Sequence, residues 1–391
     1  MDPRRNPYSP GAGTQPPELA GRDEVIERAA IALDRIKLGR GARSFVFYGL
    51  RGVGKTVLLN RIREDAEARD LATIHIEAPE NRSLPSILAP ALRAVLLRLS
   101  RKENAKDLLQ RGLRAVAGFT KALKFKYQDI DFNFDFPVEP GLADSGDLEF
   151  DLKDVLEATA RAAKQCDSAL VLFIDELQYI AEEQLAALIT ALHSASQKQL
   201  PVTMVAAGLP QLLGKMGKAK SYAERLFEFV PIDRLDEYAA RTALCRPAEK
   251  EGVAIEKAAV DEILRQTQGY PYFLQEWGKH AWNSAVNNQI VEDDALNATT
   301  DALAELDASF FRVRFDRLTP AEKQYMRAMA ALGPGPHRSG DIALRLKKKV
   351  TAVAPVRNLL IAKGMAYSPA HGDTAFTVPL FDGFLKRSLP E

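Results

Sequence analysis

The sequence predicts an α/β fold, in which a parallel sheet with helices on both faces is followed by a helical domain and a small C-terminal domain. Three observations predict it. Short apolar runs alternate with helical patterns between residues 45 and 207, residues 236–311 are helical in pattern throughout, and a compact segment of different charge begins near residue 318. Repeated strand–helix units favour a parallel sheet, because each helix returns the chain to the same sheet edge.

The composition is that of an ordinary globular protein of two or three domains, with 391 residues, 46% hydrophobic and 27% charged. The net charge of +1 gives no overall basic field that would by itself indicate nucleic acid. No apolar run approaches the roughly 18 residues of a membrane helix, and no secretion signal is visible. Cys166 and Cys245 lack metal-ligand spacing. We expect a cytoplasmic protein with no membrane partner.

The elements follow in order. Residues 1–17 are rich in proline and predict an extended N-terminal arm, since proline lacks the N–H that regular structure needs. Residues 18–235 then hold the predicted sheet domain. Its expected strands are 45–48, 73–77, 169–176 and 202–207, and its expected helices are 19–38, one from 55, 84–99, 106–120 and 182–196. Residues 236–312 predict a helical lid domain, and residues 313–391 a C-terminal domain.

One segment of the sheet domain breaks the pattern. Phe125 and Tyr127 alternate with polar residues, and the apolar residues from Ile130 to Phe136 alternate in the opposite phase. A slip between two alternating runs predicts a hairpin or a bulge, here a hairpin insertion at about 123–138.

A phosphate-binding loop follows the first predicted strand. Its residues fit the pattern G-x-x-x-x-G-K-[ST] between a strand and a helix, and they are Gly49, Leu50, Arg51, Gly52, Val53, Gly54, Lys55 and Thr56. Glycines allow backbone N–H groups to approach phosphate oxygens, and the helix that begins near Lys55 points its positive end at them. Lys55 would meet the β- and γ-phosphates and Thr56 would bind Mg²⁺; we assign the next residue, Val57, to the same nucleotide site.

A second acidic motif supports the same chemistry. A buried strand ends in Asp175-Glu176, where Asp175 would hold Mg²⁺ and Glu176 would orient and deprotonate the attacking water. The alternative is two acids that merely cap a strand. Because the sequence has no Asn-Lys-x-Asp guanine-recognition run, ATP and ADP are the expected nucleotides, and the expected activity is ATP hydrolysis.

Three segments carry a resemblance to a known family. Residues 18–24, the phosphate-binding loop and Ile174-Asp175-Glu176-Leu177-Gln178 resemble the AAA+-related ATPases that include origin-recognition initiators and archaeal-type bacterial ATPases. The resemblance implies that Leu19, Gly21 and Arg22 border the adenine. It also implies that Arg225 contacts the γ-phosphate, in cis or in trans; alternatively, Arg225 is a salt-bridged surface residue. Gly269-Tyr270-Pro271 resembles the Gly-x-Pro signature of the signalling (STAND) ATPases, in which Pro271 would pack on adenine.

Two departures from that family favour slow hydrolysis. The strand 202–207 leads into Ala206-Ala207-Gly208-Leu209, where AAA+ enzymes place a polar sensor. Tyr272 stands near the position at which origin-recognition ATPases carry a second-sensor arginine. The sequence therefore predicts a switch-like ATPase instead of a fast motor.

The C-terminal segment predicts a winged helix-turn-helix. Three helices, beginning at about 320, 340 and 351, precede a hairpin at 365–378. From residue 318 onward eleven Lys or Arg stand against five Asp or Glu, a net charge of +6. The expected phosphate contacts to double-stranded DNA are Lys347, Lys348, Lys349, Arg357 and Lys363.

Two functions remain open. In the first, an ATPase couples its nucleotide state to conformation and to DNA binding. In the alternative, a STAND-type signalling switch uses the winged helix as an autoinhibitory or protein-docking module. A stand-alone metabolic P-loop enzyme is disfavoured by the helical and C-terminal domains. Either open function allows a protein partner or self-association, and the sequence leaves the DNA target, the trigger and the oligomeric state undetermined.

Overall fold

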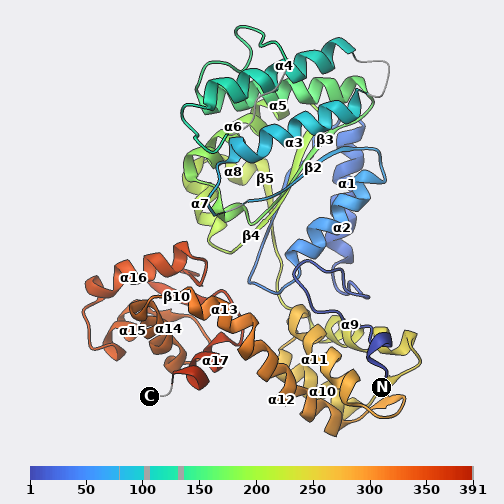
Figure 1. Cartoon of the computed structure of the whole chain (residues 1–391), viewed down its shortest axis with the longest axis vertical. Helices are drawn as coiled ribbons and strands as arrows, with labels where there is room; N and C mark the ends of the chain where they lie inside the picture. The colour runs from blue at the N-terminus through green and yellow to red at the C-terminus, as the bar shows by residue number, and fades with distance from the viewer. Residues whose placement is uncertain (79, 101–105, 131–135, 390–391) are drawn as a thin grey trace.

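The computed structural model describes residues 1–78, 80–100, 106–130 and 136–389 of the chain. Three bodies are visible in Figure 1: a sheet domain (residues 18–235), a helical domain (residues 236–308) and a winged-helix domain (residues 318–389). A short helix, α13 (Phe310–Asp316), joins the last two. Among the described residues, no helix is long and apolar enough to cross a membrane.

The sheet domain is built on a five-stranded, fully parallel sheet. Its strands, in the spatial order β2-β3-β4-β1-β5, are Ala72–Glu77, Leu170–Asp175, Val202–Gly208, Ser44–Tyr48 and Phe227–Pro231. The side chains of β3 and β4 are buried throughout, as expected for strands covered on both faces.

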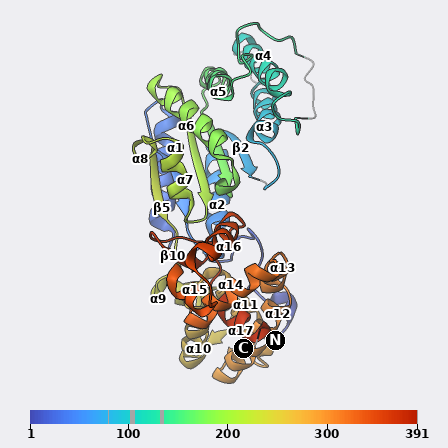
Figure 2. The same ribbon diagram turned by 90° about the vertical axis from the view of Figure 1, so that its left-hand side faces the viewer.

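Helices cover both faces of this sheet. Side chains at alternate positions, such as Phe47 and Phe173, pack on α1 (Asp23–Lys37) and α2 (Lys55–Glu67). The intervening side chains pack on the other face against α3, α4, α5 and α6, which are Leu84–Leu99, Lys106–Leu123, Leu148–Gln165 and Glu182–Gln197. Two short helices, α7 (Leu212–Ala219) and α8 (Ala223–Leu226), lead to β5. The predicted α/β class is confirmed, and Figure 2 shows the same layers from the side.

The hairpin predicted at 123–138 lies partly outside the described residues, at 131–135. On either side, residues 124–130 and 136–138 form turns and bends and no strand. Phe125 is almost fully exposed and Ile130 is buried, so the alternation at Phe125 and Tyr127 reflects a turn after α4 and not a strand.

The helical domain contains four helices and a minimal strand pair. The helices α9, α10, α11 and α12 are Glu237–Lys250, Lys257–Thr267, Pro271–Ser284 and Glu292–Ala308. The two-residue strands β6 (Ala254–Ile255) and β7 (Gln289–Ile290) pair in parallel; they are too short to leave a period-two pattern in the sequence.

The winged-helix domain has three helices and a small antiparallel sheet, followed by one more helix. In chain order the elements are α14 (Pro320–Leu332), β8 (His337–Arg338), α15 (Ser339–Arg345), α16 (Val350–Ala362), β9 (Ala366–Tyr367), β10 (Asp373–Phe376) and α17 (Phe381–Ser388). Thr319 and Glu322 form a capping box at the start of α14, in agreement with the predicted helix start. Neither β8 nor α17 is predicted from the sequence.

The helical and winged-helix domains share one hydrophobic core. Phe311 of α13 packs against Phe381 and Phe384 of α17, with ring centroids 5.7 Å and 5.4 Å apart. The sheet domain buries its side chains in two other clusters. Because packed cores resist deformation, we treat the helical and winged-helix domains as one body that meets the sheet domain across a separate interface.

The N-terminal arm is fixed to the helical domain. Tyr8 is only 3% exposed and donates its hydroxyl to the carbonyl of Leu244. The indole of Trp282 donates to the carbonyl of Asp2 over 3.0 Å, and the Asn6 amide donates to the carbonyl of Lys279 over 3.0 Å. Apart from the 3₁₀ turn η1 (Pro3–Arg5), the arm has no regular helix or strand, as its prolines predict.

Candidate functional site

The phosphate-binding loop joins β1 to α2 at the carboxyl edge of the sheet. Gly54 has φ of +90°, in the left-handed region that favours glycine. A Cβ on Gly49 would lie 1.9 Å from the carbonyl oxygen of Ile232. The loop geometry therefore requires glycine at both positions, as the sequence pattern predicted.

A cavity of about 480 Å³ opens beside this loop, within the usual range for small-molecule sites. Its walls come from the phosphate-binding loop, the ends of β2 and β3, the N-terminal segment between residues 9 and 22, Leu235 and Ala243, and the start of α11 with α13. The cavity thus lies where the sheet domain meets the body formed by the other two domains.

Lys55 lies inside the cavity with 8% of its surface exposed. Its Nζ donates to the carbonyls of Gly49 and Leu50, over 3.0 Å and 2.7 Å. Burial lowers the pKa of its ammonium group to about 8, although Glu176 and Asp175 oppose the shift. A phosphate would supply the anion that this buried ammonium lacks.

Thr56 and Asp175 form the pair that suits a magnesium ion. The Thr56 hydroxyl donates to Oδ2 of Asp175 over 2.6 Å. Burial raises the pKa of the Asp175 carboxyl, while the Thr56 hydrogen bond opposes this shift. A hydroxyl and a carboxylate at this spacing supply the hard oxygen ligands that Mg²⁺ takes alongside phosphate and water.

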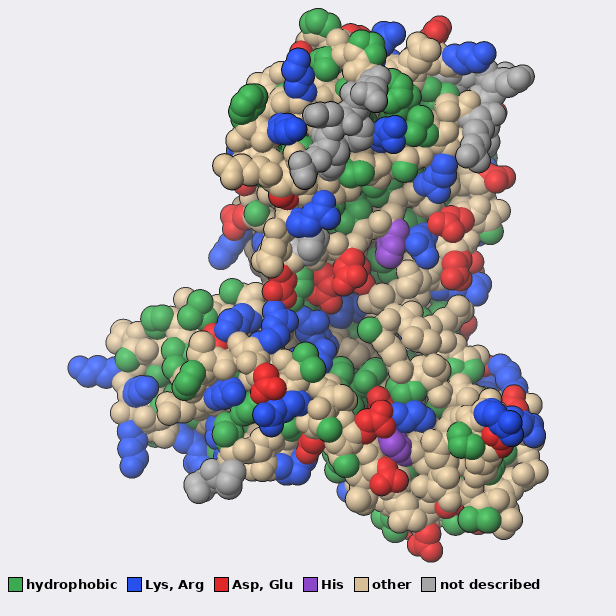
Figure 3. All heavy atoms as spheres, viewed as in Figure 1, with side chains coloured by type: hydrophobic (Ala, Val, Ile, Leu, Met, Phe, Trp, Pro, Cys, Tyr) green, Lys and Arg blue, Asp and Glu red, His purple; other side chains and the backbone are tan. Residues whose placement is uncertain are grey.

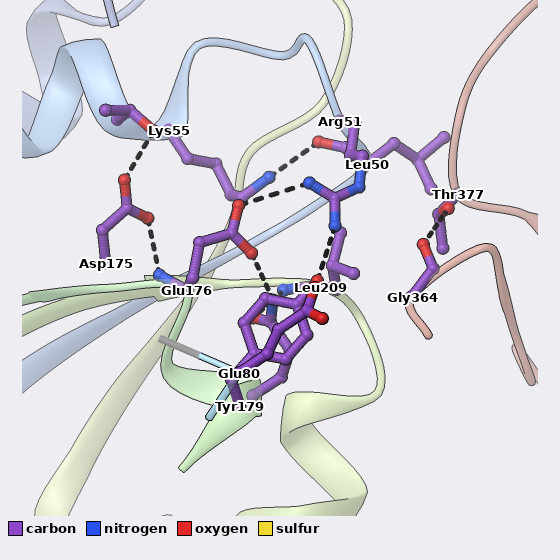
Figure 4. A network of polar contacts seen from close by, with 12 residues as sticks. Leu50, Arg51, Lys55, Glu80, Asp175, Glu176, Tyr179, Leu209, Gly364 and Thr377 are labelled. Atoms are coloured by element: carbon purple, nitrogen blue, oxygen red, sulfur yellow. Dashed lines mark hydrogen bonds and ion pairs between the residues drawn. The ribbon is translucent and has the colours of Figure 1, made fainter. Parts of the chain in front are cut away.

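Glu176 follows β3 in a left-handed conformation, with φ of +51°. Its Oε1 lies 3.4 Å from Nη1 of Arg51, and the amide of Gln178 donates to its Oε2. The same Gln178 accepts the backbone N–H of Leu209 over 3.0 Å. Gln178 therefore links Glu176 to Leu209, directly after β4, where the sequence lacks a polar sensor. Figure 4 shows Glu176 and Leu209 near each other.

The winged-helix domain contacts the phosphate-binding loop directly. The backbone N–H of Arg51 donates to the carbonyl of Thr377 in the winged-helix domain over 2.9 Å. Within the sheet domain, Nη2 of Arg51 donates to the Tyr179 hydroxyl over 2.9 Å (Figure 4). Nearby, Arg317 forms an ion pair with Glu80 at 2.8 Å. Figure 3 shows acidic side chains along this rim of the sheet domain facing basic side chains of the body below it. The contact is polar, unlike the apolar contact between the helical and winged-helix domains.

Most predicted site residues line the cavity, namely Leu19, Arg22, Arg51, Gly52, Val53, Gly54, Lys55, Thr56, Val57, Asp175, Glu176 and Pro271. Three others lie just behind the wall. Gly49 and Leu50 offer their carbonyls to Lys55, and a Cβ on Gly21 would meet Ala239 at 2.7 Å. Burial lowers the pKa of Arg22, whose guanidinium donates to the carbonyl of Val53 over 3.2 Å. The structure therefore brings the adenine-side and phosphate-side residues together.

Arg225 does not join them. It is exposed on α8, just before β5, whose Phe227 pairs with Ser44 at the start of β1. The phosphate-binding loop follows the other end of β1, roughly 16 Å away at about 3.3 Å per strand residue. This conformation does not place Arg225 for a contact with the γ-phosphate in cis, and a contact in trans stays a prediction.

Several residues of this cavity are not predicted from the sequence. The arm residues from Ser9 to Pro16, His75, Glu77, Tyr272 and Arg314 all line it. The backbone N–H of Tyr272 donates to the carbonyl of Gly52 over 3.1 Å. A Cβ on Gly13 of the arm would lie 3.0 Å from Cγ2 of Thr56. Tyr8, an aromatic residue within the proline-rich arm, is the signal that could have indicated an anchored segment.

The predicted DNA surface is only partly available. Lys347, Lys348 and Lys349 are exposed and have no ion pair within the described part of the chain. In contrast, Arg357 donates to Thr374, Ser368 and the carbonyl of Asp373. Lys363 forms an ion pair with Glu322 at 2.8 Å. Both side chains are engaged by partners within the winged-helix domain. This corrects their assignment as phosphate contacts.

Two family models match the chain. Residues 18–205 match "AAA ATPase domain", and residues 308–385 match a domain of unknown function. No curated protein matches the sequence.

Solved structures of similar fold cover nearly the whole chain. The Walker-type ATPase of Pyrococcus abyssi has 15% identity and a TM-score of 0.59, covering 95% of this chain and 97% of its own. The Orc1 protein of Aeropyrum pernix in complex with DNA has 15% identity and a TM-score of 0.49, covering 95% and 94%. The RuvB branch-migration motor of Thermotoga maritima has 16% identity and a TM-score of 0.46, covering 93% and 96%. The likeness to the Pyrococcus abyssi ATPase confirms the P-loop fold with its C-terminal winged helix, and residues 18–205 match the model of an AAA ATPase domain.

Proposed function

We propose that this protein binds ATP with Mg²⁺ and hydrolyses it slowly, and that the bound nucleotide controls how the winged-helix domain docks on the sheet domain. The contact from Arg51 carries this proposal. A residue of the phosphate-binding loop donates its N–H to the winged helix and its guanidinium to Glu176. The phosphate-binding loop, the water-activating acid and the winged helix therefore meet at one residue, which uses its backbone toward the winged helix and its side chain toward the acid.

The cavity provides what phosphoryl transfer to water requires. Lys55 and the loop N–H groups would hold the β- and γ-phosphates, and Thr56 with Asp175 would hold Mg²⁺. Glu176 would accept a proton from water as that water attacks the γ-phosphorus and ADP leaves. Pro271, with the residues near Leu19, lines the end of the cavity where the adenine would lie.

Slow turnover follows from the way Glu176 is held. Arg51 and Gln178 occupy its two carboxylate oxygens, so the attacking water must displace one of these partners to reach Glu176. Hydrolysis would require the guanidinium of Arg51 to release Glu176, at the residue whose backbone N–H contacts Thr377 of the winged-helix domain. Phosphate release from Mg-ATP, compared between the parent protein and a Glu176→Gln variant, tests the enzymatic part of the proposal.

A second candidate function is binding of double-stranded DNA. The observation that favours it is the run of three exposed lysines, 347 to 349, immediately before α16. Figure 3 shows Lys and Arg side chains projecting at the end of the winged-helix domain that lies away from the sheet domain. The outer face of α16 exposes the apolar Ala352, Pro355 and Leu359 and, beside them, Thr351 and Asn358, whose side chains can hydrogen-bond base edges. The three lysines would contact phosphates, which carry no sequence information.

The triple change Lys347→Ala, Lys348→Ala, Lys349→Ala should weaken duplex binding equally on all sequences. Removal of each lysine that contacts a phosphate should reduce the slope of log affinity against log salt by about 0.9. Fluorescence anisotropy with mixed duplexes, with ADP and with a non-hydrolysable ATP analogue, measures both effects. The matched control removes three exposed lysines of the sheet domain, 121, 164 and 218. No binding by the parent protein at about 50 mM salt, where phosphate contacts are strong, would reject the DNA function and leave the switch.

A further inference from the structure

Arg314 is a cation of the nucleotide cavity that no motif of the sequence predicts. It belongs to α13, the helix that connects the helical domain to the winged-helix domain, and its side chain lines the cavity together with Lys55, Arg51 and Glu176. Its guanidinium stacks on the ring of Phe310, 4.0 Å from the centroid, and Nη1 donates to the Phe310 carbonyl over 2.6 Å.

The neighbouring arginines differ from Arg314 in having acidic partners. Arg312 pairs with Asp316 at 3.0 Å, and Arg317 pairs with Glu80 at 2.8 Å. Arg314 has no carboxylate within 4.0 Å among the described residues. Its desolvation and the nearby Arg51 lower its pKa to about 10. A partly buried guanidinium without an anion is costly, and a ligand that brings the anion removes that cost.

The position of Arg314 identifies the part of the ligand that it meets. Arg314 lines the cavity with Glu176, the residue that would activate water. The Phe310 ring on which it stacks lies in turn on the Tyr272 ring, 4.7 Å between centroids, and the backbone N–H of Tyr272 donates to Gly52 of the phosphate-binding loop. The adenine end of the cavity lies elsewhere, near Leu19 and Pro271. The Arg314 guanidinium therefore lies at the end of the cavity where the terminal phosphate would bind.

We infer that Arg314 binds the γ-phosphate of ATP and thereby lets α13, and with it the winged-helix domain, distinguish ATP from ADP. This inference rests on the proposed nucleotide function. α13 shares the Phe311–Phe381–Phe384 core with the winged-helix domain, so a shift of Arg314 toward the phosphate moves that domain, including Thr377, relative to Arg51. Tyr272 on α11, near the position of a second-sensor arginine, has no cationic group for the γ-phosphate. Arg314 on α13 would supply that cation instead.

The test is isothermal titration of Mg-ATP and Mg-ADP into the parent protein and into Arg314→Ala, Arg314→Lys and Arg312→Ala. Arg314→Ala should weaken ATP binding about ten- to hundredfold, the range for a hydrogen bond to a charged group. ADP affinity should change less than about threefold. Arg314→Lys should recover part of the loss because it keeps the charge. Arg312→Ala, the matched control on the same helix, should bind both nucleotides like the parent.

Thermal melting separates a ligand contact from a structural one. Because Arg314 has no acidic partner among the described residues and loses only its contacts with Phe310, Arg314→Ala should melt close to the parent without nucleotide. It should lose the extra stabilisation that ATP provides. Equal losses of ATP and ADP affinity, or unchanged affinity for both, would overturn the γ-phosphate assignment while the nucleotide site itself stands. A parent protein that binds neither nucleotide would instead reject the proposed function.

Discussion

Glu176→Gln should lower the rate of ATP hydrolysis at least about a hundredfold, the usual scale for loss of a general base, while leaving ATP affinity within a few-fold of the parent. Glutamine has the same shape and can still accept from Arg51, but it cannot take a proton from water. Quantification of released phosphate under saturating Mg-ATP measures the rate, and titration calorimetry measures the affinity.

The matched control for this variant is Glu182→Gln, an exposed acid at the start of α6. It changes the charge of the same domain by the same amount and should hydrolyse ATP like the parent. If Glu176→Gln retains turnover within a few-fold of the parent, another residue activates the water. If both variants lose activity alike, the loss comes from the changed charge of the sheet domain and not from the role of Glu176 as a base.

Lys55→Ala should weaken ATP binding by about a hundredfold or more. The ammonium group supplies charge-assisted hydrogen bonds to phosphate, and loss of such bonds costs up to about 3 kcal/mol. The unliganded protein should not be destabilised, because Lys55 is buried without an ion pair and donates only to the carbonyls of Gly49 and Leu50 among the described residues. Titration calorimetry with Mg-ATP measures the affinity. Thermal melting with and without nucleotide measures the stability.

Lys164→Ala is the control here, since Lys164 is exposed on α5, away from the cavity lining. It should bind ATP like the parent and melt at the same temperature. Unchanged ATP affinity of Lys55→Ala would refute the assigned phosphate site. A lowered melting temperature without nucleotide would instead show that Lys55 stabilises the fold.

Much of the fold and the phosphate end of the site could be predicted because both depend on local patterns. The glycine spacing around Lys55 and the apolar strand before Asp175 are continuous in sequence, and their chemistry follows from spacing alone. The helix starts at Thr319 and near Val350 were accessible for the same reason, since capping and periodicity are local.

The features that were not predicted are contacts between distant segments. Arg314 reaches the cavity only because α13 crosses it, and the arm lines the same cavity only because Tyr8 is buried beneath α9 and α11. The side chains of Arg357 and Lys363 looked free in sequence, but folding pairs them with Thr374 and Glu322. The resemblance left open whether Arg225 acts in cis or in trans, because it cannot say which end of a strand a residue occupies. None of these contacts produces a periodic or compositional pattern in the sequence.

Pulsed electron paramagnetic resonance between spin labels tests the central claim, control of docking by nucleotide. Exposed positions Gln165 on α5, Leu296 on α12 and Asn358 on α16 would be changed to cysteine in pairs, with the partly exposed Cys245 replaced by serine. In the Glu176→Gln background, the pair 165–358 should show different distance distributions with ADP and with ATP. The pair 296–358 should stay constant, because the helical and winged-helix domains share one core. An identical 165–358 distribution without nucleotide, with ADP and with ATP would contradict the account.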